Sequence, residues 1–322
     1  MTAKHYTGTA ETAALNSVNF VVLGDPAIAG ELGKKGTSTD ITIYDRKTAD
    51  IVYTWTVPNT FPDKIQPLMQ AVNIAEYAIL NVSKLDRFLG EQVLALDYAG
   101  IKEGFVLHSY EVDREKLRAL LKGTSLAGYQ FVDSVDQLKQ EMAKLAPKGQ
   151  DGPVMIPVDH AFDVKGVGTV VLGVVRQGSI KAYDELTLQP SGKTVLVKSI
   201  QMHDDPVDSS SSPARVGLAV KGPSAGDISR GDVICAPCTV KVASGPVAAK
   251  FQKSPFFKGE LADNQMYMLS VGMQIRPVKV KLAGEMLEIT PEKPMVYLPG
   301  QACVLLKPDS QTTRIIGKGV FQ

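Results

Sequence analysis

The chain has 322 residues, of which 44% are apolar and 21% are charged, and its formal net charge is +1. This length and apolar content are sufficient for two or three domains with separate cores, and the near-neutral charge does not indicate a nucleic-acid or membrane surface for the chain as a whole. No run of about 18 apolar residues predicts a membrane span. Residues 1–15 lack the apolar segment of a signal peptide, so we expect a cytoplasmic protein.

Three cysteines and four histidines could bring redox or metal chemistry. Cys235 and Cys238 have the spacing of redox and zinc motifs, but strand-like sequence flanks them where a redox pair needs a helix start. A zinc site also needs a second ligand pair nearby. His108 ends an expected strand, where open α/β sheets often place functional groups, but it has no metal-binding spacing to another histidine. We expect incidental thiols, no catalytic residue and no metal site.

Residues 17–145 alternate between strand and helix patterns. Residues 18–23 form an apolar run that ends at Gly24, and residues 40–45 and 51–57 alternate around a turn, which is typical of a hairpin. The other expected elements are helices over 65–74, 85–99, 113–122 and 135–145 and strands over 77–82, 104–108 and 129–132. This alternation predicts a mostly parallel sheet with helices on both faces.

Everything after a Pro- and Gly-containing linker at residues 146–153 has strand patterns. A second boundary near Cys238 divides the chain into expected domains 1–150, 151–238 and 239–322. Residues 204–213, rich in Asp and Ser, are expected to form an exposed turn. In the last domain the expected strands cover 245–251, 265–274, 276–283, 295–297, 301–307 and 314–321.

Residues 162–235 contain Val/Ile-rich runs broken by single glycines, which is typical of a small antiparallel barrel. The amino-acid sequence of this stretch resembles that of the second domain of translational GTPases of the elongation factor Tu type, including the selenocysteine-specific factors. The resemblance implies a P-loop-NTPase-like α/β domain followed by two β-barrels, which agrees with the order of elements above.

The resemblance also implies a GTP site at the end of the first strand. A P-loop needs Gly-x-x-x-x-Gly-Lys-Ser/Thr, whose backbone N–H groups and lysine hold the phosphates. Here Gly24 and Asp25 follow the strand, and the lysine position falls on Gly30 or on Glu31. A carboxylate about 4 Å from a phosphate costs on the order of 4 kcal/mol at an effective dielectric of about 20. Residues 33–38 contain the residue types of a P-loop, but they follow the first expected helix instead of preceding it. We expect them to form a helix C-cap and a loop.

The other nucleotide motifs of the family are altered too. Residues 57–60 read Val-Pro-Asn-Thr where the family has Asp-x-x-Gly, and only Asp113 remains from the guanine-reading Asn-Lys-x-Asp. Asp113 also has the position of a helix N-cap. We treat Gly24, Asp25, Gly30 and Asp113 as a vestigial nucleotide site. The expectation is no GTP hydrolysis and no cofactor, with GTP or GDP and Mg²⁺ as the alternative.

Charge is unevenly distributed. Residues 239–322 carry 11 basic and 6 acidic groups, whereas the first two expected domains carry 24 and 28. In the family that the chain resembles, the two barrels contact tRNA or ribosomal RNA. Cationic side chains are suited to RNA phosphates. The candidate RNA-binding residues are Arg215, Lys221, Lys250, Lys253, Arg276, Lys279 and Lys281.

Three hypotheses follow. The first is an elongation-factor-like protein that binds tRNA or the ribosome without a nucleotide switch, and that is not an enzyme. The second is a divergent elongation factor that still binds GTP. The third is a scaffold whose barrels hold a protein partner. None of the three involves a membrane.

Overall fold

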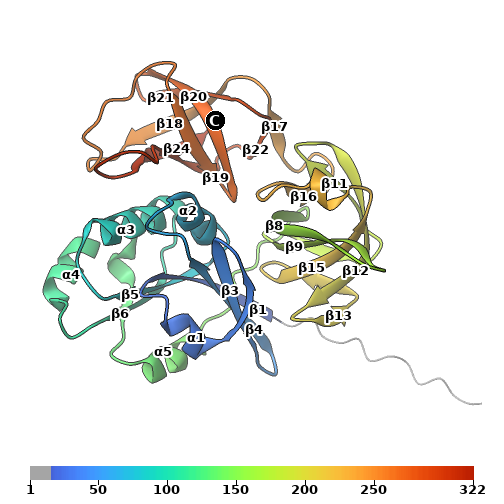
Figure 1. Ribbon diagram of the computed structural model, residues 1–322, viewed down its shortest axis with the longest axis horizontal. Helices are drawn as coiled ribbons and strands as arrows, with labels where there is room; N and C mark the ends of the chain where they lie inside the picture. Colours follow the sequence, from blue (N-terminus) through green and yellow to red (C-terminus); the bar gives the residue numbers. More distant parts are fainter. Residues whose placement is uncertain (1–15) are drawn as a thin grey trace, which may run out of the picture.

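The computed structural model describes residues 16–322 and contains an α/β domain and two β-barrels (Figure 1). Figure 1 shows the barrel of the second domain (the second barrel) beside the α/β domain, and the barrel of the third domain (the last barrel) above it. The expected fold class is therefore confirmed. Among residues 16–322, none of the helices has the length and apolar character needed to cross a membrane.

The first domain is built on a seven-stranded sheet with the order β2-β3-β4-β1-β5-β6-β7. Its strands are β1 (Asn16–Gly24), β2 (Lys34–Ser38), β3 (Ile41–Lys47), β4 (Ile51–Pro58), β5 (Tyr77–Val82), β6 (Gly104–His108) and β7 (Gln130–Phe131). The pairs from β4 through β7 are parallel, and β2 and β3 extend the sheet in antiparallel pairing. The mostly parallel sheet and the hairpin are as predicted.

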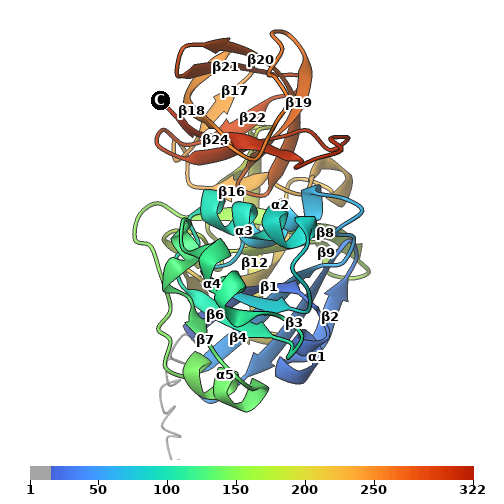
Figure 2. The same cartoon turned by 90° about the vertical axis from the view of Figure 1, so that its left-hand side faces the viewer.

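Five helices cover the two faces of this sheet. They are α1 (Ile28–Leu32), α2 (Gln66–Asn73), α3 (Arg87–Ala99), α4 (Arg114–Leu121) and α5 (Val135–Met142). Alternate residues of β1 point to opposite faces, so Val21 and Leu23 pack with α2, α3 and α4, whereas Phe20 and Val22 pack with α1 and α5. Figure 2 shows α2 and α3 on the side of the domain that faces the last barrel.

The segment predicted as a C-cap and loop is partly a strand. Gly33 does cap α1, but residues 34–38 form β2, which pairs with β3 at the edge of the sheet. Four of the five residues of β2 are exposed. An exposed edge strand needs no apolar alternation, and its Lys, Gly, Thr and Ser composition therefore resembles a loop.

The second domain is a closed ring of six strands. In ring order they are β11 (Glu185–Gln189), β16 (Val233–Cys235), β8 (Met155–Val164), β9 (Gly168–Val174), β15 (Arg215–Lys221) and β12 (Lys193–Met202), and β11 pairs with β12 to close it. Gly173 has a clear role, because a Cβ there would lie 2.5 Å from the carbonyl oxygen of Pro157 on the neighbouring strand. The glycine lets the two backbones approach.

The expected exposed turn at 204–213 contains two short strands. β13 (Asp205–Val207) extends β12, and β14 (Ser209–Ser211) pairs with β10 (Ser179–Lys181). Ser210 is buried beneath this pairing. The prediction of a simple turn was wrong because backbone pairing, rather than side-chain composition, orders the segment.

The third domain is a closed six-stranded barrel. Its strands in ring order are β18 (Val247–Lys253), β21 (Met286–Pro291), β20 (Gln274–Ala283), β19 (Met266–Val271), β23 (Ala302–Leu306) and β24 (Ile315–Phe321). β17 (Lys241–Ala243) and β22 (Met295–Tyr297) form a separate pair. β21 was not predicted, although Leu287 and Ile289 alternate with more exposed neighbours and are fully buried.

The cysteines differ in accessibility. Cys238 is exposed, whereas Cys235 and Cys303 are buried, and burial raises their pKa values to about 11 and about 12. Within residues 16–322 no group of three His, Cys, Asp or Glu side chains is placed to hold a metal ion.

We expect one thiol per native chain, that of Cys238, to react rapidly with a disulfide reagent near pH 8, because only an accessible thiolate attacks the reagent. All three thiols should react in denaturant. The absorbance of the released chromophore measures both numbers, and Cys238→Ser serves as the control. Rapid native reaction of two or three thiols would contradict the buried positions of Cys235 and Cys303.

Candidate functional site

The turn after β1 is held by hydrogen bonds of its own. Gly24 has a φ of 85°, and a Cβ there would lie 1.9 Å from the carbonyl oxygen of Asn81 on β5. The Asp25 N–H donates to that same oxygen at 2.8 Å, and the Asn81 amide donates to the Asp25 carbonyl at 3.1 Å. The Asp25 carboxylate accepts the Ala27 N–H at 3.0 Å. Two N–H groups that a phosphate-binding turn would present are thus already used.

The other vestigial nucleotide residues lie elsewhere. Gly30 is inside α1, where its N–H donates to the carbonyl of Ala27 and a Cβ would meet nothing within 4 Å. Asp113 is the N-cap of α4, as predicted, and accepts the N–H groups of Glu115 and Lys116. The hydrogen bonds from the N–H groups of Lys116 and Glu115 lower the pKa of Asp113. The structure therefore brings only Gly24 and Asp25 together.

This set of residues does not fit a nucleoside triphosphate with Mg²⁺. The turn offers the carboxylate of Asp25 where a triphosphate needs a cation, and Lys34 and Lys35 belong to β2 rather than to this turn. Four negative charges without a neutralising side chain are strongly disfavoured.

His108 ends β6 with its Nδ1 3.0 Å from the Ser109 carbonyl oxygen and its ring against Phe131.

A cavity lies between the first domain and the second barrel. It has a volume of about 550 Å³, and residues of β2 and β3 form one wall. The barrel wall includes Phe162 and Val167, which are 43% and 40% exposed, and Arg215. A partly exposed aromatic ring beside polar groups is a surface on which a base or another flat group can stack.

Arg215, a predicted RNA contact, is engaged with Asp159 in a two-bond ion pair with N–O distances of 3.1 and 3.2 Å. Asp159 is 2% exposed and also lies 2.8 Å from Nδ1 of His160. Burial alone would raise the pKa of Asp159, but Arg215 and His160 outweigh it, so the pKa lies below its ordinary value. Asp159 therefore neutralises the charge of Arg215.

Two further arginines join the second barrel to the first domain. Arg230 pairs with Asp40 of the first domain at 2.7 Å and also contacts Gln70 at 3.4 Å. Arg176 pairs with Glu76 of the first domain at 2.5 Å. Burial raises the pKa of Glu76, and Arg176 opposes that effect.

Arg276, the other predicted arginine contact, pairs with Asp232 of the second barrel at 3.1 Å. Because a carboxylate already neutralises each of them, Arg215 and Arg276 are left out of the RNA surface proposed below.

A buried ion pair joins the first and third domains. Glu91 of α3 and Arg314 are 4% and 9% exposed in their side chains, and Arg314 Nη2 lies 2.5 Å from a Glu91 carboxylate oxygen. Arg314 Nε lies 3.1 Å from both Glu91 oxygens, and Nη1 donates to the Pro62 carbonyl at 2.6 Å.

The predicted lysines lie on barrel surfaces. Lys250 and Lys253 of β18 and Lys279 and Lys281 of β20 are exposed, and β21 lies between the two strands. Lys250 also lies 3.2 Å from Glu285, in a pair that solvent screens. Lys221 is exposed at the end of β15 in the second barrel. The four lysines of the third domain thus lie on two strands separated by β21, whose exposed Glu288 is opposite Lys281, and Lys221 is separate.

Sequence reasoning missed the residues that join the domains, among them Asp40, Glu76 and Glu91. Their arginine partners are 190, 100 and 223 residues away, so no local pattern could reveal them. An acidic residue within an otherwise buried helix, as at Glu91, was the one available signal.

Comparison with known proteins identifies the family. The family model of elongation factor Tu domain 2 matches residues 168–235. Uncharacterized protein MJ0325 of Methanocaldococcus jannaschii is 33% identical over 296 residues, which are 91% of this chain and 95% of that protein. The selenocysteine-specific elongation factor of the same organism is 25% identical over 240 residues, 67% of this chain and 51% of that factor. The chain belongs to the elongation factor Tu and SelB family of translational GTPases.

Solved structures show the SelB fold for this family member. Translation elongation factor SelB from Methanococcus maripaludis, in complex with the GTP analogue GppNHp, matches with a TM-score of 0.82 and 23% identity over 96% of this chain and 79% of that one. A bacterial selenocysteine-specific factor, EF-Sec, matches with a TM-score of 0.82 and 20% identity over 95% and 58%. The chain spans about half the length of the M. jannaschii selenocysteine-specific factor.

Proposed function

We propose that this family member binds tRNA or the ribosome in the cytoplasm through its barrels, without binding or hydrolysing GTP. The observation that carries the proposal is the turn after β1. Its N–H groups are bonded to Asn81 and Asp25, and it presents a carboxylate rather than a lysine. A GTPase switch depends on the γ-phosphate ordering nearby loops, and this turn has no cation with which to hold that phosphate.

Two surfaces support RNA as the partner. The cavity beside Phe162 offers a stacking surface next to the polar groups of Thr37 and Gln201. The exposed lysines of β18 and β20 offer phosphate contacts on the third domain. Together they suit an RNA with an unpaired end and a backbone that runs along a barrel.

We expect fluorescent GDP to show no saturable binding at micromolar concentrations, with or without Mg²⁺. We expect tRNA to bind with an affinity that falls steeply with salt. Fluorescence anisotropy measures both. Micromolar binding of GDP that requires Mg²⁺ would instead support a divergent GTP-binding factor. Failure to bind tRNA or ribosomes would leave the scaffold hypothesis.

The variant with Lys279→Glu and Lys281→Glu is expected to bind tRNA at least about tenfold more weakly and to reduce the salt slope by about 2, since each phosphate contact adds about 1. The matched control reverses Lys64 and Lys102, two exposed lysines of the first domain. An equal loss in both variants would show that net charge, and not this barrel face, determines binding.

A further inference from the structure

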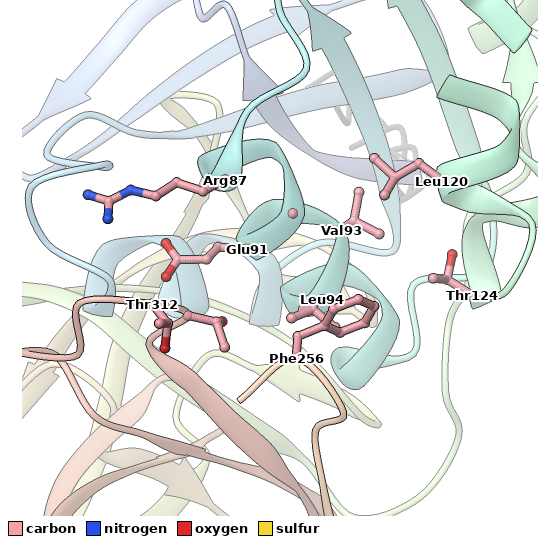
Figure 3. Close-up of a pocket in the computed structure, with 10 residues that line it drawn as sticks. Arg87, Glu91, Val93, Leu94, Leu120, Thr124, Phe256 and Thr312 are labelled. Carbon is pink, nitrogen blue, oxygen red and sulfur yellow. The ribbon is translucent and has the colours of Figure 1, made fainter. Parts of the chain in front are cut away.

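An apolar cavity lies at the junction of the first and third domains. Its volume is about 370 Å³. Figure 3 shows Val93 and Leu94 of α3, Leu120 of α4 and Phe256 of the third domain around it. Because the walls come from two domains, an occupant would contact both at once.

Two large side chains at this cavity are left in contact with solvent. Phe256 is 59% exposed and Leu120 is 40% exposed. Phe256 is held in place by its neighbours, since Ser254 and Phe257 are buried in the third domain and the Phe256 N–H lies 3.4 Å from the Ser254 hydroxyl oxygen. Exposed apolar side chains that line a preformed hollow from two sides are typical of an interaction site.

The cavity continues into a polar one. Arg87, Glu91 and Thr312 line both this cavity and a neighbouring cavity of about 280 Å³ that also includes Asp63 and Gln311. The Glu91–Arg314 ion pair described above lies where the two meet, so the groove formed by both cavities is apolar at one end and polar at the other. The same ion pair fixes the two domains that form the groove.

The charge around the apolar end is positive. Arg87 lines the cavity, and Lys258 Nζ donates to the carbonyl of Pro255, the residue before Phe256, at 3.1 Å. Both cations are exposed, and neither forms an ion pair with any carboxylate of residues 16–322. Exposed cations around an apolar hollow are complementary to an acidic surface with an apolar centre.

We propose that this groove binds a segment of a protein partner that inserts one or two large apolar side chains between Leu120 and Phe256 and carries acidic residues on either side. A volume of 370 Å³ is at the low end for small-molecule pockets and suits anchoring side chains rather than a whole helix. The apolar wall favours a polypeptide over RNA, whose phosphates would need cations along the groove. The proposal does not depend on RNA binding.

A displayed library of random peptides tests it. Peptides are selected on the full chain and counter-selected on a variant with Leu120→Ser and Phe256→Ser. We expect enriched peptides to combine Leu, Phe or Trp with Asp or Glu. A synthesised peptide should bind at least about tenfold more weakly to Phe256→Ser, as for an interface hot spot. Leu282→Ser, which alters a 42% exposed leucine elsewhere in the third domain, should bind as the wild type does.

A second variant tests the charge. Arg87→Glu combined with Lys258→Glu should weaken peptide binding and remove its salt dependence, while the thermal melt of each variant confirms that it is folded. The proposal is overturned if no peptide is enriched, if enriched peptides carry no acidic residues, or if Phe256→Ser binds them unchanged. It is equally overturned if light scattering shows self-association that Phe256→Ser abolishes, because the occupant would then be a second copy of the chain.

Discussion

Arg314→Ala is expected to lower the free energy of unfolding by about 3–5 kcal/mol, because it leaves the carboxylate of Glu91 buried without its positively charged partner. Glu91 is 3% exposed, and four hydrogen bonds from the backbone and side chain of Arg314 reach its oxygens at 2.5 to 3.1 Å. The unneutralised carboxylate should also disturb the packing of α3 against the last barrel. Urea titration measures the effect.

The single tryptophan, Trp55, is fully buried in the first domain, so its fluorescence reports the unfolding of that domain. The matched control is Lys250→Ala, which removes an ion pair with Glu285 whose side chains are 67% and 78% exposed. That change should cost at most about 1 kcal/mol. A loss below about 1 kcal/mol for Arg314→Ala would mean that the two domains do not depend on this pair.

Asp159→Asn is expected to cost about 3 kcal/mol at neutral pH, because the amide has the shape of the carboxylate but cannot neutralise Arg215. The cost should depend on pH. Arg215 and His160 hold the pKa of Asp159 below its ordinary value against the effect of burial, so the native state favours the ionised form. Its contribution is present above the ordinary carboxyl pKa of about 4 and is lost as the pH falls through the lowered pKa.

The difference in unfolding free energy between wild type and Asp159→Asn should therefore be constant from neutral pH to about pH 5 and shrink at lower pH. Asp208→Asn, at an exposed aspartate of the same barrel, should change stability by no more than about 0.5 kcal/mol. A difference that grows as the pH falls would show that the native state binds the proton more tightly than the unfolded chain, contrary to the lowered pKa.

Local patterns predicted the fold well where an apolar run or a helix cap is present. The apolar run of residues 18–23 predicted a strand, and β1 is covered on both faces, as the two cores show. Asp113 was correctly predicted as an N-cap. The glycine-interrupted runs of residues 162–235 gave a barrel, and the strand ring confirms it. In each case the signal lies within a few residues of the element.

Other features depend on contacts that the local sequence does not encode. β2 and β14 are polar strands ordered by backbone pairing, so their composition resembled loops. The arginine contacts that join the first domain to the two barrels are between residues 100 to 223 positions apart. The sequence identified the lysines proposed as RNA contacts, but it could not show which of them lie near one another. Only the barrel places β18 and β20 on either side of β21.

One side chain touches all three domains. Gln70 of α2 is 8% exposed, donates to the Met273 carbonyl of the last barrel at 3.1 Å, and accepts from Arg230 of the second barrel at 3.4 Å. Rotating either barrel away from the sheet would remove one of the two hydrogen bonds of this amide. The contacts of Gln70 therefore hold the three domains in one arrangement before any ligand binds. A ligand that spans the domains would not have to offset the entropy lost in ordering them, and its affinity would be higher for that reason.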